Sequence, residues 1–278
     1  MPEPIHRHHH YHAEASTLDG ELHLPFVQKV CSHTASKLNE NGGYVTQHAD
    51  RFHLGGVINF RSSYTHVGGN RDSKHDHGWN TITTAAIEGL NVMEVVTADR
   101  VVAQISTDHP LEGYVPRVTF LGTRFENLRI AGHPVEIDFD PTIVGSKPTN
   151  DSAYTTDSEL IQRVTRQYRH ISSHQNLPQE LASRYNQLPS VSNRESIECS
   201  LVNQVKGSFP GRSFGHVIYV PDFGKIHLAT LRIEHSDFNT SIPKQTLICL
   251  TMLRLEMGCI GGGIISLGSG KTNGVTQP

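Results

Sequence analysis

The sequence predicts a mainly β protein, an antiparallel sandwich or barrel-like fold with one inserted helical hairpin. The densest β-patterning in the 278 residues lies between Trp79 and Asp140, where short apolar or alternating runs end at Gly, Pro or Asn. These runs recur about every ten to fifteen residues without a helical period between them, which is typical of antiparallel pairing. A clear helical period begins only at Thr156. The length accommodates one large β domain or two smaller ones.

The amino-terminal part contains a histidine-rich segment followed by a strand signal. We expect residues 1–17 to form a flexible His-rich arm, because such a segment has little apolar surface to bury. The apolar run from Leu18 to Val30 contains Pro25. Since proline cannot donate a ladder hydrogen bond, this run predicts an edge strand. A second strand is expected over Val57 to Tyr64, between two pairs of glycines.

Four strands are expected in the central stretch. The first runs from Trp79 to Ile87 and is followed by a turn signal at Glu88 to Asn91. Arg100 to Thr107 begins with apolar residues at both odd-numbered and even-numbered positions, which predicts a strand covered on both faces. Arg117 to Leu121 is rich in β-branched and aromatic residues. Val135 to Asp140 alternates strictly and therefore predicts a half-buried strand.

A helical hairpin is expected over residues 156–188. Thr156-Asp157-Ser158-Glu159 fits a capping box, in which the threonine hydroxyl would cap the first turn. Apolar residues then recur at helical spacing: they are Leu160, Ile161, Val164, Tyr168 and Ile171. A shorter helix follows from Pro178 to Leu188, since proline favours the first turn. The hairpin is expected to pack against the sheet or between two β halves.

The carboxyl-terminal third returns to strands. In Gly224 to Glu234 the apolar parity switches near Ala229, which predicts a bulge. Thr246 to Cys259 is the longest candidate and would span roughly 40 Å. Its odd-numbered residues, including Leu247 and Cys249, are expected on one face and Ile248, Leu250 and Met252 on the other, so its first half should need cover on both sides. Residues 261–278 are expected to form a Gly-rich tail, so the β-rich domain is expected over residues 18–260.

Composition excludes several classes of partner and site. A formal charge of −3 gives no electrostatic reason to expect nucleic acid. No run of eighteen apolar residues predicts a membrane span, and no apolar signal core is present. We therefore expect a cytoplasmic protein, or one exported without a recognisable signal peptide. The four cysteines form no C-x-x-C pair, which argues against a disulfide scaffold or a zinc ribbon.

The most specific metal signal is His75-Asp76-His77, because an H-x-H pair on an extended segment projects both imidazoles to one side. His75 and His77 are the candidate ligands, and the alternative is a solvated polar loop. A third ligand would have to come from His48, His53 or His66, none of which has a diagnostic spacing. Zinc, copper, nickel and iron remain open as the metal.

Two catalytic patterns are incomplete. Gly211 to Gly215 has the G-x-S-x-G spacing around Ser213, but a strand follows where a nucleophile elbow needs a helix. The carboxylates of Glu136, Asp138 and Asp140 share one strand face roughly 6.5 to 7 Å apart, too far to hold one ion together easily. No catalytic or cofactor-binding residue is therefore predicted, and no cofactor beyond the transition metal that His75 and His77 could bind.

Three segments carry a resemblance: VVTADRVVAQISTDHP, VTFLGTRFENLRIAGHPV and SFGHVIYVPDFGKIHLATLRIE. Through them the chain resembles a family of uncharacterised bacterial proteins. The resemblance implies no activity, cofactor or site residue.

The functional expectation is a non-enzymatic structural or interaction protein that self-associates as a homo-oligomer, in a ring or a filament. Its contacts are expected at Leu18 to Val30, at the terminal segments, or at both. The alternative is a His-based metal-binding protein or metalloenzyme of β-barrel type. A carbohydrate-binding sandwich is less favoured, because Trp79 is the only tryptophan available as a platform.

Overall fold

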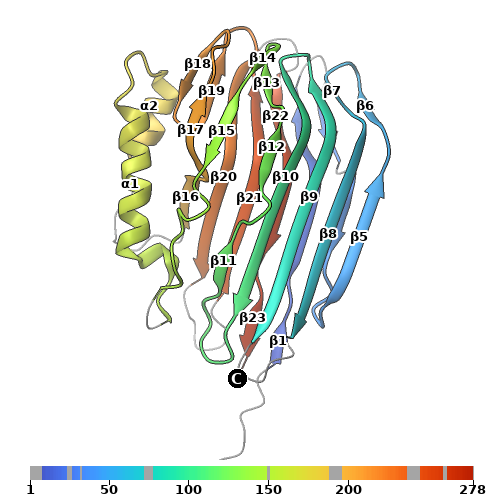
Figure 1. The fold of residues 1–278 in the computed structure, drawn as a ribbon, viewed down its shortest axis with the longest axis vertical. Helices are drawn as coiled ribbons and strands as arrows, with labels where there is room; N and C mark the ends of the chain where they lie inside the picture. The colour runs from blue at the N-terminus through green and yellow to red at the C-terminus, as the bar shows by residue number, and fades with distance from the viewer. Residues whose placement is uncertain are drawn as a thin grey trace, which may run out of the picture.

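The computed structural model describes residues 8–23, 27–31, 33–71, 78–148, 151–187, 196–236, 245–258 and 262–277. Strands account for 58% of the structure and helices for 11%, and the strands form two packed sheets that do not close into a barrel. Figure 1 shows the sheets face to face, with the helices outside one lateral edge. The predicted fold class, an antiparallel sandwich with an inserted helical hairpin, is confirmed.

Ten strands of the described chain form the first sheet, in which β9 and β10 make a long central hairpin. Its strands are β5 (Gly43–Ala49), β6 (Phe52–Leu54), β7 (Ile58–Phe60), β8 (Ser62–Arg71), β9 (Trp79–Val92), β10 (Val96–His109), β11 (Arg117–Thr119), β12 (Arg124–Glu126), β13 (Arg129–Ile130) and β14 (His133–Pro134).

Nine described strands form the second sheet, ordered β18-β19-β20-β21-β22-β2-β3, with β16 on β20 and β4 on β2. Its strands are β2 (Ala13–Leu22), β3 (Gln28–Val30), β4 (Ala35–Lys37), β16 (Ser196–Ser200), β18 (Arg212–Phe214), β19 (Val217–Val220), β20 (Gly224–Ser236), β21 (Gln245–Met257) and β22 (Gly263–Thr272).

Two short ladders connect the ends and sides of the sandwich. β15 (Glu136–Phe139) follows the first sheet and pairs with β17 (Val202–Lys206), which follows β16 of the second sheet. This ladder ties the two sheets together along one side. At the lower end in Figure 1, β1 (His8–His10) pairs with β23 (Val275–Gln277) and joins the two ends of the chain.

The opposite side is held by buried hydroxyl groups. The Thr34 hydroxyl, beside β4, donates to the Ser63 hydroxyl of β8 over 2.9 Å. Ser36 and Thr65 form a second such contact at 2.8 Å. Because buried hydroxyl groups need partners, these pairs hold β4 against β8 at a defined position.

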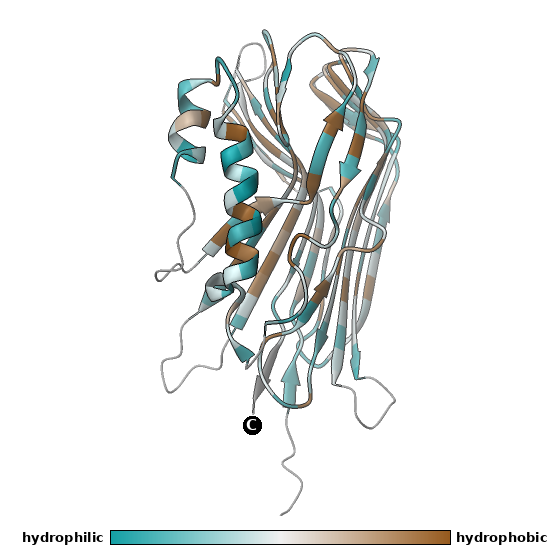
Figure 2. Ribbon diagram, turned by 60° about the vertical axis from the view of Figure 1, so that its left-hand side comes forward, coloured by the Kyte–Doolittle hydropathy of each residue, from teal (hydrophilic) through white to brown (hydrophobic). Residues whose placement is uncertain are grey.

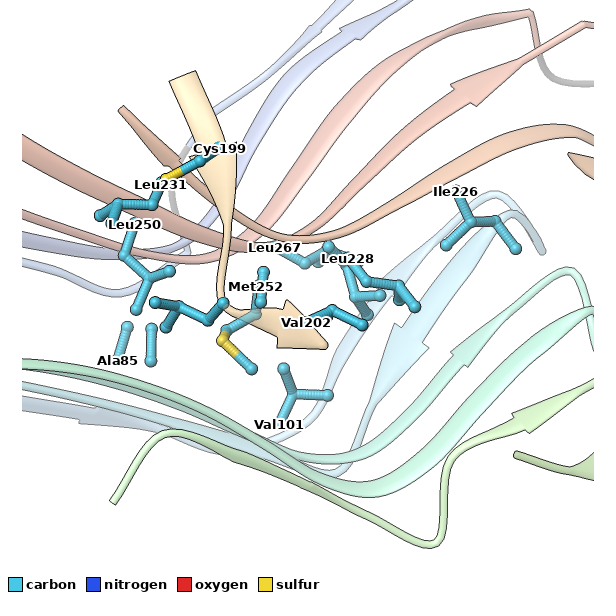
Figure 3. Close-up of a cluster of buried hydrophobic side chains, with 14 of the residues drawn as sticks. Ala85, Val101, Cys199, Val202, Ile226, Leu228, Leu231, Leu250, Met252 and Leu267 are labelled. Atoms are coloured by element: carbon cyan, nitrogen blue, oxygen red, sulfur yellow. The ribbon is translucent and has the colours of Figure 1, made fainter. Parts of the chain in front are cut away.

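The core lies between the sheets. In Figure 3, Ala85 and Val101 of the first sheet face Leu250 and Met252 of the second. Val202 of β17 enters the same cluster, so the connecting ladder also contributes to the core. All five side chains are buried. The burial of this apolar surface is the main force that holds the two sheets together.

A transverse row of irregular residues crosses the second sheet. The row consists of one residue from each of four neighbouring strands: Thr17 of β2, Gly268 of β22, Met252 of β21 and Ala229 of β20. These residues do not pair with one another, although the strands pair in the same register before and after them. Gly268 and Ala229 have positive φ angles of 63° and 43°. In all four strands the buried side chains switch at this row between odd-numbered and even-numbered positions. The row therefore lets long strands keep one side on the core while the sheet twists.

Two expectations about the second sheet concern residues in this row. The parity switch predicted near Ala229 is present, but it inserts no residue relative to β21, since Leu228 pairs with Leu253 and Thr230 with Thr251. The first half of Thr246 to Cys259 was expected to need cover on both faces. Its even-numbered residues are buried up to Met252, whereas Leu247 and Cys249 are only half-buried, and the odd-numbered residues are buried from Leu253 to Met257. Cys259 lies outside the described residues.

The first sheet has a similar irregularity, and it explains a misplaced turn. A turn was expected at Glu88 to Asn91, whereas β9 continues to Val92. Gly89 has a φ of 62° within the strand. The actual turn is at Met93 and Glu94, with φ angles of 51° and 59°. Two successive positive φ angles are the geometry that matches the twist of a tight hairpin.

Strands are present at both ends of the described chain, where the sequence predicted a flexible arm and a tail. β2 begins at Ala13, inside the predicted arm over residues 1–17, and lies between β22 and the β3–β4 edge. β22 lies inside the predicted tail over residues 261–278, yet it is paired on both sides and buries Ile265 and Leu267. Backbone pairing and apolar burial outweigh the glycine content of these segments. The expected edge strand over Leu18 to Val30 is two strands, of which only β3 is at an edge, and Pro25 is outside the described residues.

The helical hairpin is confirmed as α1 (Ser158–Ser172) and α2 (Gln179–Tyr185). The predicted apolar face of α1 is buried, and Figure 2 shows its more hydrophilic face turned outward. The cap is Asp157, whose carboxylate accepts from the amides of Glu159 and Leu160. Thr156 instead ends a short 3-10 helix, η2 (Tyr154–Thr156), and donates its hydroxyl to Ala153. Leu188 lies outside the described residues.

Candidate functional site

The strongest candidate features are two clusters of buried histidines and one unpaired strand edge. The first cluster lies where β1 meets the ends of β9 and β10. The His9 ring stacks on Trp79, with ring centroids 5.1 Å apart, and lies 4.5 Å from the ring of His109. His109 is also the register partner of Trp79. The three rings therefore form a compact group, the terminal histidine cluster.

Gly274 shows how closely the two imidazoles converge. A β-carbon at Gly274 would lie 2.6 Å from Nε2 of His9 and 2.8 Å from Nε2 of His109. Both distances are below van der Waals contact, so only glycine fits here without displacing a ring. The two Nε2 atoms thus approach one point from two different strands.

Burial keeps both imidazoles neutral at pH 7. It lowers the pKa of His9 to about 4, and the neighbouring His10 adds a smaller repulsion. Burial lowers the pKa of His109 well below its usual value, with further contributions from His9 and Lys147. Neither ring nitrogen of His109 has a hydrogen-bond partner within the described chain. A neutral imidazole with an available lone pair is the form that binds a metal ion.

The predicted metal ligands His75 and His77 lie outside the described residues. Their flanking residues Arg71 and Gly78 are at the end of the sandwich that holds the terminal histidine cluster, since Arg71 pairs with Trp79.

The proposed third ligands are distributed over three strands. His48 and His66 are diagonal neighbours on the β5–β8 ladder, whereas His53 lies on β6. The Thr46 hydroxyl lies within hydrogen-bond distance of His66, 2.9 Å from its Nδ1. Among the residues that the structure describes, no group of three or more His, Cys, Asp or Glu is placed to hold a metal ion. The described residues thus contain imidazole pairs but not a complete ligand set.

The second histidine cluster lies between α2 and the strands of the second sheet. The Tyr185 hydroxyl is 3.0 Å from Nε2 of His216. Burial lowers the pKa of His216 to about 3, and His227 and Arg184 add to the effect. Nε2 of His227 lies 3.2 Å from the Glu256 carboxylate, and this contact lowers the pKa of Glu256 to about 2. The cluster is thus a largely buried network in which burial favours the neutral form of His216.

The incomplete catalytic patterns have structural roles. Ser213 lies in the β18–β19 hairpin, so a strand and not a helix follows it, as the sequence predicted. Asp138 accepts a hydrogen bond from the Asn203 amide, and Asp140 accepts from the backbone and hydroxyl of Thr142. These carboxylates stabilise the β15–β17 region.

The unpaired edge is β5, which the sequence analysis missed. Among the described strands it pairs only with β8, so one side of its backbone carries no ladder partner. Residues 43–49 include no charged residue and no proline, and Tyr44 is 81% exposed. The β-forming run from Tyr44 to Thr46 was the available signal, but the polar and glycine neighbours concealed it.

These features describe a β-sandwich whose one lateral edge is covered by helices and whose other edge includes an exposed strand. The chain belongs to the family described as Domain of unknown function (DUF8256), whose model matches residues 9–234. The predicted membership of an uncharacterised family is thereby confirmed, and a bacterial origin stays an expectation. No curated protein and no solved structure matches the chain. None of the described helices is long and apolar enough to cross a membrane.

Proposed function

We propose that this chain is a non-enzymatic structural or interaction protein that self-associates, and that a second copy docks on β5. The observation that carries the proposal is the unpaired edge of β5, which lacks the charges and prolines that usually protect an edge strand. An exposed edge of this kind is a template for pairing with another chain.

Pairing of β5 with β5 of a second copy fits the composition of the strand. Because residues 43–49 carry no formal charge, two antiparallel copies bring no like charges together. In a two-fold arrangement centred on Thr46, Tyr44 of one copy lies opposite His48 of the other. Such a contact is isologous and joins two first sheets into one continuous sheet. Pairing of β5 with the edge strand β3 is heterologous instead and would produce a ring or a filament.

Light scattering after size-exclusion chromatography at micromolar concentration tests the proposal. We expect a mass of at least twice the 30.8 kDa of one chain. The double variant Tyr44→Lys/His48→Lys places like charges opposite each other in the two-fold pairing and is expected to be monomeric. The control Leu121→Lys/Tyr219→Lys also changes two partly exposed side chains to lysine, away from the β5 edge, and should keep the wild-type mass. A monomeric wild-type protein would overturn the proposal.

A second candidate function is His-based metal binding. It is supported by the neutral terminal histidine cluster, which lies beside the residues that flank His75 and His77. Metal analysis of protein purified without a nickel column tests it, with His75→Ala/His77→Ala as the companion variant. A stoichiometric transition metal that the variant loses would support this function. Wild-type protein without stoichiometric metal would remove it.

A further inference from the structure

A cleft of about 390 Å³ separates α1 from β16, β17 and the β18–β19 hairpin, and we name it the α1 cleft. Arg166 and His170 of α1 line one side of it. Ile143 and Val202 contribute apolar surface, and the buried residue His216 lies on the inner side. This volume is within the range of small-molecule sites, and the mixture of apolar walls with a few polar groups is typical of them.

The walls of the cleft are fixed by hydrogen bonds. Gln167 donates to the carbonyls of Ser200 and Val202 and accepts from the Ser200 amide. Arg163 donates to the carbonyls of Ile143 and Val144. These contacts attach α1 to the strands and to the preceding loop, so the opening does not depend on a mobile element.

Two polar side chains of α1 are not used in these contacts. Arg166 and His170 are four residues apart, so they project from the same face of the helix. Neither side chain forms a hydrogen bond or ion pair with another residue in the described ranges, although the His170 ring meets that of His174 edge-on, with ring centroids 5.1 Å apart. Asp140 is the acidic side chain at the cleft, and its Oδ1 already accepts two hydrogen bonds from Thr142. The cleft therefore presents an arginine and an imidazole that form no ion pair with Asp140, the one carboxylate among its lining residues.

The inner side of the cleft also carries a nitrogen that can donate a hydrogen bond, Nδ1 of His216. Burial raises the pKa of Tyr185, so its hydroxyl keeps its proton. The hydroxyl lies 3.0 Å from Nε2 of His216, and in the tautomer in which it donates to Nε2 the imidazole proton is on Nδ1. Nδ1 is buried and has no hydrogen-bond partner among the described residues. In that tautomer the inner side of the cleft holds a buried N–H donor that lacks an acceptor.

We infer that the α1 cleft binds a small organic anion, whose carboxylate or phosphate group is held by Arg166 and His170 and whose apolar part lies against Ile143 and Val202. Arginine and histidine offer N–H donors to anionic oxygens, and hydrogen bonds to charged groups are the strong ones. Because these polar side chains and the apolar wall line the same cleft, molecules that have both kinds of surface fit it best. This ligand site is separate from the β5 edge and does not depend on self-association.

Isothermal titration calorimetry with phenyl phosphate and phenylacetate tests the inference, because each probe joins one aromatic ring to one anionic group. We expect one-to-one binding at about 1 mM or tighter for at least one probe, and at least about tenfold weaker binding of the neutral control benzyl alcohol. The tighter of the two anionic probes identifies the phosphate or the carboxylate as the preferred group.

Two arginine variants separate a defined site from general charge attraction. Arg166→Gln is expected to weaken binding of the preferred probe at least about tenfold. Arg169→Gln makes the same charge change on α1 but outside the cleft, so it should change the affinity less than about twofold. Both arginines are exposed, and the variants should keep the wild-type unfolding temperature. The inference is overturned if neither anionic probe binds, or if both variants weaken binding equally.

Discussion

Lowering the pH from 7 to 5 should destabilise this protein through its buried imidazoles. The pKa of His9 is lowered to about 4 and that of His216 to about 3, from an ordinary value of 6.5. Each imidazole is therefore neutral in the folded protein at a pH at which it is protonated in the unfolded chain. The stability that this neutrality provides is complete above pH 6.5 and is lost as the pH falls toward the folded pKa.

The magnitude follows from the difference between the unfolded pKa and the final pH. At pH 5 that difference is about 1.5 units, so each group costs about 2 kcal/mol of unfolding free energy, and the two together about 4 kcal/mol. His109 shifts in the same direction and adds to the loss. The free energy of unfolding of a typical domain is only about 5–15 kcal/mol. The change is therefore large relative to the total stability.

Titration of the Glu256 carboxylate does not contribute to the loss of stability between pH 7 and pH 5. The pKa of Glu256 is lowered to about 2 from 4.5, chiefly by His227. Its contribution is present above the unfolded value of 4.5 and is lost only as the pH falls from there toward 2. Between pH 6.5 and 5 the buried imidazoles should therefore dominate the pH dependence.

Urea unfolding followed by circular dichroism at pH 7, 6 and 5 measures the effect. His216→Gln should reduce the loss between pH 7 and 5 by about 2 kcal/mol, because one titrating group is removed. The exposed residue His133 provides the control, and His133→Gln should leave the pH dependence unchanged. An unfolding free energy that is the same at pH 7 and pH 5 would refute the assignment of neutral buried imidazoles.

Five substitutions, two of them controls, test the local structure by urea unfolding at pH 7. Asp157→Ala should cost about 1 kcal/mol because it removes the side-chain cap of α1, whereas Thr156→Ala should cost clearly less; equal losses would contradict the assignment of the cap. Gly274→Ala should cost about 1–3 kcal/mol, because its methyl group would collide with two imidazole nitrogens, and an unchanged stability would argue against their convergence. Gly268→Ala should cost about 1–2 kcal/mol because φ is 63°, while Gly258→Ala, which has open space and no positive φ, should cost less.

Local patterns were sufficient for the fold class and for the helices. The helical spacing of Leu160 to Ile171 predicts the buried face of α1, because a period of 3.6 residues places these side chains on one side whatever they pack against. The alternation from Val135 to Asp140 predicts β15 for the same reason. The parity switch at Ala229 could also be recognised, because the apolar side chains themselves change sides.

Site residues were harder to predict, because their proximity comes from pairing between distant segments. His9 and His109 meet only because β1 pairs with β23 and lies against the ends of β9 and β10. The α1 cleft combines a helix with strands that follow it by about 30 residues or more along the chain. No spacing rule along the sequence connects such residues.

Sequence patterns thus predicted the kinds of elements in this protein, since backbone geometry translates hydrophobic periodicity directly into a helix or a strand. The tertiary structure decided where each strand lies in a sheet. The Gly-rich segment that contains β22 became a central strand and the segment that contains β5 became an exposed edge, although neither had a strong local signal. Strand order depends on which apolar faces and backbone groups find partners across long sequence separations, and that information is not present in any single window of the chain.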